Sequence, residues 1–353
     1  MKGILLTGVN FALSSGDSIH TMNICECLKL FSEVKVYSQT AKKNIWRLFN
    51  YGLCIFNTIR SVRKSPLDYI WIRSFFGSTV LKVIKDNVGV FVYDLNSCIA
   101  EEREFLKMNK FKTKVIESEM EKTLSLANII RVHNEHLKRY VIHRYKNKVP
   151  DISKKISVIP IPIVVNKYPV KRNFRSKEFS IVYAGGTKKW QGLEHLIDAI
   201  KIIDRSDIRL TIYSKNIPDS IKRSLRKNIF LKYLPHEKLI KILANYDLFV
   251  IPRPSNIITE TSTPLKFIEA MACGVPILAS DVGGINEFVK HKKHAYLVKP
   301  GDPEAIAEGI LEIIENKELA QKMSENSRKL VEKKFDYKIV SRKIEKLLNG
   351  YLS

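Results

Sequence analysis

The chain has 353 residues, of which 45% are hydrophobic and 27% charged, a composition that allows two buried cores and excludes a low-complexity protein. Lysine and arginine number 60 against 36 aspartates and glutamates, so the formal net charge is +24. A surface this basic attracts anions such as nucleic acid, anionic lipid or phosphorylated ligands, and the charge alone does not say which.

The first half of the chain alternates short β-rich runs with helical patterns, which is typical of an α/β domain with a parallel sheet. The opening run MKGILLTGVN is too short for a signal peptide or a membrane span, and we interpret it as a buried first strand. The strands are expected at 4–9, 34–37, 69–72, 90–93, 129–132 and 156–159. Helical patterns lie between them, for example at 18–31, 78–87 and 117–127.

The segment at 159–179 carries three prolines and no helical period, which predicts a linker. A second α/β series follows it, with strands expected at 180–184, 209–213, 229–233, 248–251 and 276–279 and helices at 193–203, 237–245 and 264–272. The sequence therefore predicts two Rossmann-like, doubly wound parallel-sheet domains that face a cleft. Their expected bounds are 1–165 and 179–335, with a linker over 166–178 and a C-terminal helix over 336–353 that packs back on the first domain.

The most informative run lies at 249–289. Within it, Thr263 is a good helix N-cap and Pro264 a good first helical residue. Lys266 then lies in the first turn, where the helix dipole disfavours a cation unless an anion binds at the helix N-terminus. Glu269, on the neighbouring face, could accept hydrogen bonds from a pair of sugar hydroxyls. From the residues alone, this is either a diphosphate site or an ordinary capped helix of an α/β protein.

The run TPLKFIEAMACGVPILASDVGGINEFV, followed by AYLVKPGDPEAIAEGI, resembles the donor-binding signature of the retaining GT-B-fold glycosyltransferases of family four, also called group 1. YAGGTKKWQGLEHLIDAI resembles the first strand, turn and helix of that family's donor domain, and KISVIPIPI its interdomain strand and linker. LSSGDSIHTMNICECL and ANIIRVHNEHLKRYV resemble parts of its acceptor domain. The resemblance covers nearly the whole chain and is loosest between 41 and 73.

The resemblance implies a GT-B fold in which 1–165 binds the acceptor and 179–335 binds a nucleotide-diphosphate sugar. It further implies sugar transfer with retention of configuration, without a metal or other cofactor. Glu269 matches the second glutamate of the family's Glu-x7-Glu motif, which binds the ribose of the nucleotide. Thr261 lies where the first glutamate is expected, and Glu260 is one position off. Gly186 and Gln191 likewise replace the donor-domain arginine and lysine of the family.

Other cations are therefore expected to neutralise the diphosphate. We assign this role to Arg253 and Lys266, with Lys188 and Lys189 as weaker candidates. Fixed cations at a helix N-terminus would stabilise the charge that the departing diphosphate leaves. The catalytic residues are thus predicted to be Arg253, Lys266 and Asp94. The other predicted donor-binding residues are Gly16, Gly185, Gly186, Thr263, Glu269, Gly283 and Gly284, in which the glycine amides can come close to a ligand.

The first domain is expected to supply the acceptor side of the site. Gly16 is predicted to lie in a loop before a helix capped by Asp17 or Ser18, which suits a substrate phosphate. Asp94 ends the strand VFVYD, where it would contact the donor sugar or an acceptor hydroxyl, or else cap a turn. The acceptor-side candidates are Arg73, Asn96 and Glu102, whereas His20 and His133 are interpreted as ordinary polar residues.

The acceptor is the least specified partner. Residues 42–60 are apolar over most of a helical circumference with basic flanks, which suits a helix lying on anionic lipid. The preferred interpretation is nevertheless a buried helix between the second and third strands. A basic run at 138–155 and the net charge of +24 support, as a working hypothesis, a lipid-linked or other cell-envelope glycan acceptor at the cytoplasmic face of a membrane.

Three alternatives stay open. Thr261 in place of a glutamate suggests a non-catalytic, glycosyltransferase-like regulatory subunit, and a sugar-nucleotide epimerase could share the fold. A nucleic-acid-binding protein is favoured only by charge, since no recognition helix or aromatic-basic RNA motif is present. The five cysteines lack metal-ligand spacing and are expected to be reduced thiols. The protein is therefore expected to be cytoplasmic, and peripheral attachment to the cytoplasmic face of the membrane is left open. The base and sugar of the donor are not specified by these residues.

Overall fold

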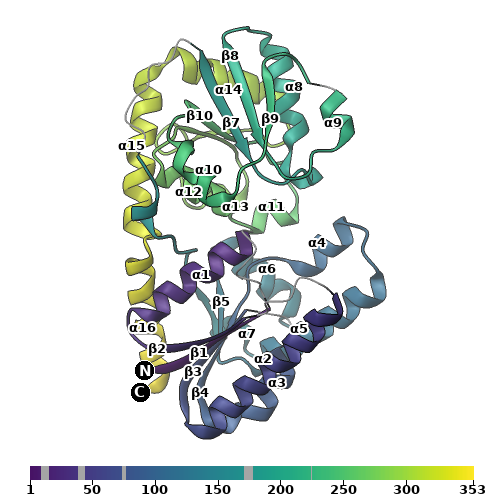
Figure 1. The fold of residues 1–353 in the computed structure, drawn as a ribbon, viewed down its shortest axis with the longest axis vertical. Coiled ribbons are helices and arrows are strands. Elements are labelled where there is room, and N and C mark those ends of the chain that lie inside the picture. The colour runs from purple at the N-terminus through teal and green to yellow at the C-terminus, as the bar shows by residue number, and fades with distance from the viewer. Residues whose placement is uncertain (9–15, 39–43, 74–76, 171–177, 224) are drawn as a thin grey trace. The chain divides into compact units, whose positions relative to one another are not determined.

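The computed structural model describes residues 1–8, 16–38, 44–73, 77–170, 178–223 and 225–353. They form two compact units (Figure 1). Unit 1 consists of Met1–Ile163 and Phe335–Ser353, and unit 2 of Val164–Lys334. Each unit is described by itself below.

Unit 1 is built on a six-stranded parallel sheet with the strand order β2-β1-β3-β4-β5-β6. The order reverses direction beside β1, which is the mark of a doubly wound sheet. The strands are β1 (Lys2–Thr7), β2 (Glu33–Ser38), β3 (Leu67–Arg73), β4 (Val88–Asp94), β5 (Ile129–Val132) and β6 (Ile156–Val158). All six strands expected from the sequence are therefore present, and the predicted fold class is confirmed for this half.

Helices cover both faces of the unit 1 sheet because alternate strand residues point to opposite sides. Ile4, Leu6 and Ile70 pack towards one face, and Leu5 and Trp71 towards the other. The first face is covered by helices that include α2 (Asn44–Lys64), α3 (Gly77–Ile84), α5 (Lys110–Leu126) and α6 (Glu135–Tyr145), and the second by α1 (Gly16–Lys29) and α16 (Tyr337–Leu352). The remaining short helices are η1 (Lys85–Asn87), α4 (Ile99–Phe105) and α7 (Ile152–Lys155).

Unit 2 holds a second six-stranded parallel sheet, with the order β12-β11-β10-β7-β8-β9. Its strands are β7 (Phe179–Ala184), β8 (Ile208–Tyr213), β9 (Ile229–Lys232), β10 (Leu248–Ile251), β11 (Ile277–Ser280) and β12 (Tyr296–Val298). The sequence pattern missed the three-residue strand β12, which is too short to show a period. The other five strands, and with them the predicted fold class, are confirmed.

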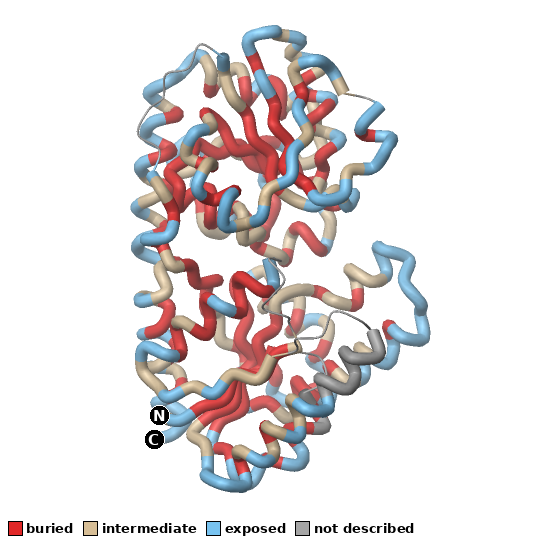
Figure 2. The backbone as a smooth tube through the Cα atoms, in the orientation of Figure 1, coloured by how far each residue is buried: buried red, intermediate tan, exposed pale blue. Residues whose placement is uncertain are grey.

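The core of unit 2 lies between this sheet and helices that include α8 (Leu193–Ile203) and α14 (Pro303–Glu315). Figure 2 shows the central strands of the sheet as buried and the helices as alternating between buried and exposed residues. The other helices are η2 (Val165–Lys167), η3 (Lys189–Gln191), α9 (Asp219–Arg223), α10 (His236–Leu243), α11 (Ile257–Thr261), α12 (Leu265–Ala272), α13 (Gly283–Asn286) and α15 (Lys317–Lys334).

Two predicted helix starts were wrong. Gly16 is not in a loop but is the first residue of α1. Thr263 does not cap α12, because Pro264 keeps an extended ψ of 128° and holds the N-cap position without a side-chain hydrogen bond, so that helical dihedral angles begin only at Leu265. Thr263 is buried one residue earlier. Lys266 therefore still lies in the first turn.

Two further expectations concern segments between elements. The predicted linker at 166–178 begins inside unit 2, where Val165 and Tyr168 are buried, and its residues 171–177 lie outside the described part of the chain. Residues 44–60 of the segment 42–60 belong to α2, which follows β2 and precedes β3. Thr58 of α2 is buried whereas Leu53 and Phe56 are exposed. Among the described residues, no helix has the length and apolar character needed to span a bilayer.

Candidate functional site

Arg253 follows β10 at the carboxyl edge of the unit 2 sheet, the edge at which open α/β sheets bind ligands. Its side chain is buried, and its guanidinium donates from Nη1 to the carbonyl of Ser262 at 3.1 Å and from Nη2 to Oε1 of Gln191 at 3.3 Å. Gln191, which replaces a cation of the resembled family, thus orients Arg253. The cation is held by two loops before any ligand binds.

Glu269 of α12 is only 1% exposed and has its Oε1 atom occupied. Tyr168 donates to this oxygen from Oη at 3.1 Å, and His236 from Nε2 at 2.5 Å. Burial alone would raise the pKa of Glu269, but the His236 hydrogen bond and the charge of Lys266 outweigh it and lower the pKa. Glu269 is therefore a charged, oriented carboxylate beside Lys266, which is half-buried.

His236 and Tyr168 were missed by the sequence analysis. His236 begins α10 four residues after β9 ends, and this position at the carboxyl end of a strand was the only available signal. Tyr168 lies in a segment interpreted as a linker, where no pattern indicates a contact with α12. Both side chains reach Glu269 only through the tertiary fold of unit 2.

The Gly283–Gly284 turn opens α13, and its first amide has a partner within the protein. Gly283 N–H donates to Oε2 of Glu260 at 2.7 Å, and Ser255 Oγ donates to Oε1 of the same carboxylate at 2.6 Å. Gly284 is packed so tightly that a Cβ atom would lie 2.3 Å from the carbonyl oxygen of Ser262. The expectation that the Gly283 amide is open to a ligand therefore does not hold in this structure, because Glu260 occupies it.

Thr261 is buried beside this turn and donates from Oγ1 to the carbonyl of Ile257 at 2.7 Å. A threonine here bonds back within its own short helix and presents no charge. The carboxylate that the resembled family places at this position is thus not reproduced, whereas the neighbouring Glu260 is used to hold α13.

The loop after β7 carries Gly185 and Gly186, followed by Lys188 and Lys189 in or beside η3. Both lysines are exposed, and Lys188 Nζ lies 4.6 Å from the ring centroid of the buried Trp190. Tyr183 of β7 stabilises this loop, because its Oη donates to the carbonyl of Gly186 at 2.5 Å. The predicted cations of this loop are thus presented at the carboxyl edge of the sheet.

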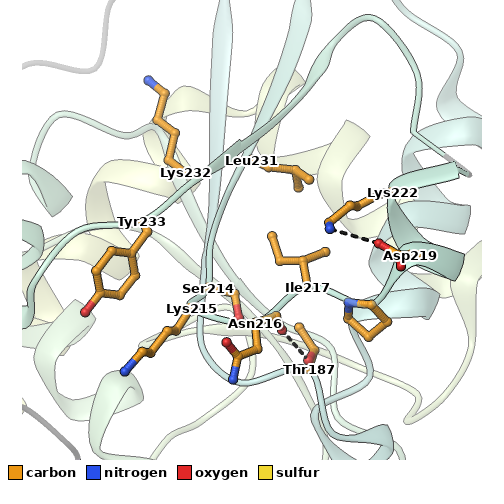
Figure 3. Close-up of a pocket in the computed structure, with 11 residues that line it drawn as sticks. Thr187, Ser214, Lys215, Asn216, Ile217, Asp219, Lys222, Leu231, Lys232 and Tyr233 are labelled. Atoms are coloured by element: carbon orange, nitrogen blue, oxygen red, sulfur yellow. Dashed lines mark hydrogen bonds and ion pairs between the residues drawn. The ribbon is translucent and has the colours of Figure 1, made fainter.

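A pocket of about 690 Å³ lies at the same edge, against the ends of β8 and β9 (Figure 3). Its lining includes Lys215, Lys222, Lys232 and Tyr233, and Asp219 pairs with Lys222 at 2.9 Å. The sequence analysis did not name its residues. Of the predicted donor-binding residues, none lines it.

In unit 1, the ends of β3, β4 and β5 bring two buried arginines to one carboxylate. Arg131 Nη1 lies 2.8 Å from Asp94 Oδ1, and Arg73 Nη1 lies 3.1 Å from Asp94 Oδ2. Trp71 Nε1 also donates to Oδ2, and Arg73 donates to Asn96 at 2.7 Å. Burial would raise the pKa of Asp94, but the charges of Arg131 and Arg73 lower it. Both oxygens of Asp94 are thus used within the protein.

His20 of α1 completes this cluster. Its Nε2 atom lies 3.2 Å from Arg131 Nη1, and because a guanidinium can only donate, this nitrogen accepts and the imidazole is neutral. Burial, together with the charges of Arg73 and Arg131 and the neighbouring His133, holds the pKa of His20 well below its usual value. The cluster carries two permanent cations against one buried carboxylate.

The structure therefore brings together three of the predicted first-domain residues, Arg73, Asp94 and Asn96, and adds Arg131. Glu102 lies in the first turn of α4. Gly16 adjoins the cluster through its neighbour Asp17, whose Oδ1 lies 3.4 Å from Arg73 Nη2. Asp94 is buried beneath the two guanidiniums, so it organises this edge of the sheet and its expected direct contact with substrate stays a prediction.

All five cysteines are free thiols. Within the described ranges, no group of three or more His, Cys, Asp or Glu side chains is placed to hold a metal ion.

Comparison with known proteins gives one family. Residues 164–330 match the family model of the glycosyl transferases group 1. CapM, a capsular polysaccharide biosynthesis glycosyltransferase of Staphylococcus aureus, is 32% identical over 184 residues, which cover 49% of this chain and 47% of that protein. The chain thus spans about half the length of this relative. An uncharacterized glycosyltransferase of Methanocaldococcus jannaschii is 24% identical over 83% of this chain and 75% of its own length.

Solved structures match over nearly the full chain. The Anabaena protein HepE in complex with UDP has a TM-score of 0.77 at 14% identity, covering 99% of this chain and 100% of that one. Sucrose-phosphate synthase from Thermosynechococcus elongatus has a TM-score of 0.77 at 18% identity, covering 99% of both chains. At these identities the likeness establishes the fold, and the GT-B fold predicted from the sequence is confirmed.

Proposed function

We infer that this chain, in which residues 164–330 belong to the glycosyl transferases of group 1, transfers a sugar from a nucleotide-diphosphate sugar to an acceptor. The observation that carries the proposal is the arrangement of cations at the carboxyl edge of the unit 2 sheet. Arg253 is oriented there by Ser262 and Gln191, and Lys266 lies in the first turn of α12 with no ion pair to any described residue. A diphosphate is the ligand that such a pair of cations fits.

The proposed chemistry is electrostatic. When the nucleotide diphosphate leaves, negative charge grows on its oxygens while the sugar becomes oxocarbenium-like. Arg253 is permanently charged and already held in place, so it stabilises that charge without reorganising, and Lys266 adds a second positive charge. We propose that the sugar keeps its configuration, with attack on the face from which the diphosphate departs, and that no metal takes part.

Glu269 is proposed to hold the ribose of the donor. The bonds from Tyr168 and His236 both reach Oε1, and a carboxylate has about four acceptor sites, so Oε2 can accept from ribose hydroxyls. The lysine-lined pocket beside β8 and β9 is proposed to accommodate the rest of the nucleotide, with Tyr233 as a surface for stacking.

A cell-envelope glycan or its lipid-linked precursor is the proposed acceptor, and the cytoplasmic face of a membrane the proposed location. The capsular polysaccharide relative supports the first part, and the net charge of +24 supports the second. In unit 1, Arg73 and Asn96 are the proposed acceptor-side contacts, because Asp94 and Arg131 already fix their position.

A second candidate function is that of a non-catalytic regulatory subunit. One specific observation favours it: Glu260, the carboxylate nearest to the missing motif glutamate, is bonded to Gly283 and Ser255 inside the protein. A chain with this arrangement could bind a nucleotide sugar without turning it over.

Incubation with a panel of UDP- and GDP-sugars, followed by thermal shift and by assay of slow donor hydrolysis, tests the proposal. The wild-type protein is expected to be stabilised by one class of donor and to hydrolyse it. Lys266→Met should weaken donor binding about tenfold or more, since it removes a charge next to the diphosphate.

Lys241→Met is the matched control, because Lys241 is an exposed helix lysine of the same unit. Binding of a donor without hydrolysis or transfer would favour the regulatory subunit. Indifference to every nucleotide sugar, or equal donor affinity in the Lys266 and Lys241 variants, would contradict the proposed site.

A further inference from the structure

Residues 104–115, named the α4–α5 tip here, join the end of α4 to the first turns of α5. In Figure 1 this turn stands clear of the strands of its unit, and Figure 2 shows it as exposed. Of its twelve residues only Thr113 is buried, and the other eleven are exposed. No role in the proposed transfer reaction uses this segment.

The tip has an ordered backbone. Met108 N–H and Lys107 N–H donate to the carbonyls of Arg103 and Glu104, each at 2.9 Å, and Lys107 adopts a left-handed φ of 52° that closes the turn. Asn109 then caps α5 by accepting from the backbone N–H of Lys112 at 3.0 Å. The backbone of the tip is therefore closed by its own hydrogen bonds.

Five large apolar side chains of the tip face solvent. Their exposed fractions are 43% for Phe105, 41% for Leu106, 43% for Met108, 76% for Phe111 and 50% for Val115. Phe111 and Val115 are four residues apart on α5 and so share one face of the helix. Single exposed apolar residues are ordinary, but five within eleven residues form a patch of the kind that marks an interaction site.

Lysines alternate with these apolar residues. Lys107, Lys110, Lys112 and Lys114 are exposed, and within the described part of the chain none of them forms an ion pair. Glu104 is the one acidic residue in the tip, so four lysines leave a local charge of +3. Bulky apolar groups between cations match the boundary between acyl chains and anionic headgroups, where both kinds of side chain are satisfied at once.

We propose that the α4–α5 tip docks the protein on an anionic lipid bilayer. Phe111, with Leu106, Met108 and Val115, enters the headgroup region, and the lysines bind the anionic headgroups around it. Binding of lipid by the tip does not depend on sugar transfer. The inference that docking brings the protein to a lipid-linked acceptor rests on the proposed function. A nucleic acid would satisfy the lysines but leave the aliphatic side chains exposed.

Vesicle flotation of the full-length protein tests the docking. With phosphatidylcholine vesicles containing phosphatidylglycerol the wild type should float, whereas pure phosphatidylcholine or high salt should abolish flotation. Lys110→Gln/Lys112→Gln should lower the partition coefficient on the order of 25-fold, about fivefold per lysine, which corresponds to about 1 kcal/mol each. Phe111→Ser/Val115→Ser should lower it at least tenfold.

Leu53→Ser/Phe56→Ser is the matched control, because both residues are exposed apolar side chains of α2 in the same unit. It should float like the wild type. The proposal is overturned if the wild type does not float with anionic vesicles or if the tip variants float like the wild type. It is also overturned if the α2 variant is the only one that fails to float. Donor-induced thermal shift should be the same in wild type and tip variants, so failure of docking and failure of the proposed transfer are read separately.

Discussion

Asp94 and Arg131 are register partners on the neighbouring strands β4 and β5, and their side chains meet at 2.8 Å with His20 beside them. Separately, each looks like a polar residue at or near the end of a buried strand. Together they form a network in which one carboxylate neutralises part of the charge of two guanidiniums. Such a network specifies one arrangement because a buried charge left unpaired costs several kcal/mol.

The pH dependence of stability should report on His20. Since burial and two arginines hold its folded pKa well below 6.5, the unfolded chain binds the proton first. Stability is therefore lost as the pH falls below about 6.5, by at most about 1.4 kcal/mol per pH unit. In urea titrations of the full-length protein that follow the unfolding of unit 1, the free energy of unfolding should fall less between pH 7 and pH 5 in the His20→Gln variant than in the wild type.

His143→Gln, at an exposed position of α6, is the control and should keep the wild-type pH dependence. If the free energy of unfolding depends on pH in the same way in the His20 variant and in the wild type, protonation of His20 is not the cause of the loss of stability in acid.

At the scale of elements, the donor side of the candidate site depends on how closely two loops of unit 2 approach. Gly192, between η3 and α8, has a φ of 71°, and a Cβ atom there would lie 1.8 Å from the carbonyl oxygen of Pro252. That carbonyl belongs to the residue before Arg253. The glycine therefore lets the loop carrying Gln191 reach the loop carrying Arg253.

Gly192→Ala should destabilise the protein by about 2 kcal/mol or more and weaken donor binding, because the clash separates Gln191 from Arg253. Gly186→Ala, in the same loop with open space around its Cα, should change stability by no more than about 0.5 kcal/mol. Thermal unfolding and donor titration of both variants measure this. Equal behaviour of the two would contradict the steric argument.

At the scale of the whole molecule, the chain leaves unit 1 at Ile163, builds unit 2, and returns at Phe335. The two passages are joined where Ile163 N–H donates to the carbonyl of Phe335 at 2.8 Å and Tyr337 N–H donates back to Ile163 at 2.9 Å. Val340, Ile344 and Leu348 of α16 are then buried in the core of unit 1. The last helix is thus part of the first unit.

Ile344→Asp should expose unit 1 to limited proteolysis while the fragment 164–334 stays resistant, since the charge is buried in one core only. Lys343→Asp, at the adjacent exposed position, should digest like the wild type. If both units of the Ile344 variant were cleaved at the same rate, the two cores would not be energetically separate.

Strand and helix periods, with turn residues between them, were sufficient to predict both sheets, because a buried parallel strand needs a continuous apolar run that stands out locally. The positions of Arg253 after a strand and of Lys266 in the first turn of a helix were also predictable, whereas their roles toward a diphosphate stay predictions. The three-residue strand β12 and the first residue of α12 were not predictable, because one extended proline shifts a helix start without changing the pattern.

Which groups hold those cations and carboxylates could not be read along the chain. Tyr168 and Glu269 are 101 residues apart, and His20 and Arg131 are 111 apart, so their hydrogen bonds exist only once strands are ordered in a sheet. The use of Glu260 by Gly283 depends on the same long-range packing. The periodic pattern of apolar residues reports on neighbours in the sequence, whereas burial and electrostatic interactions join residues that are neighbours in space.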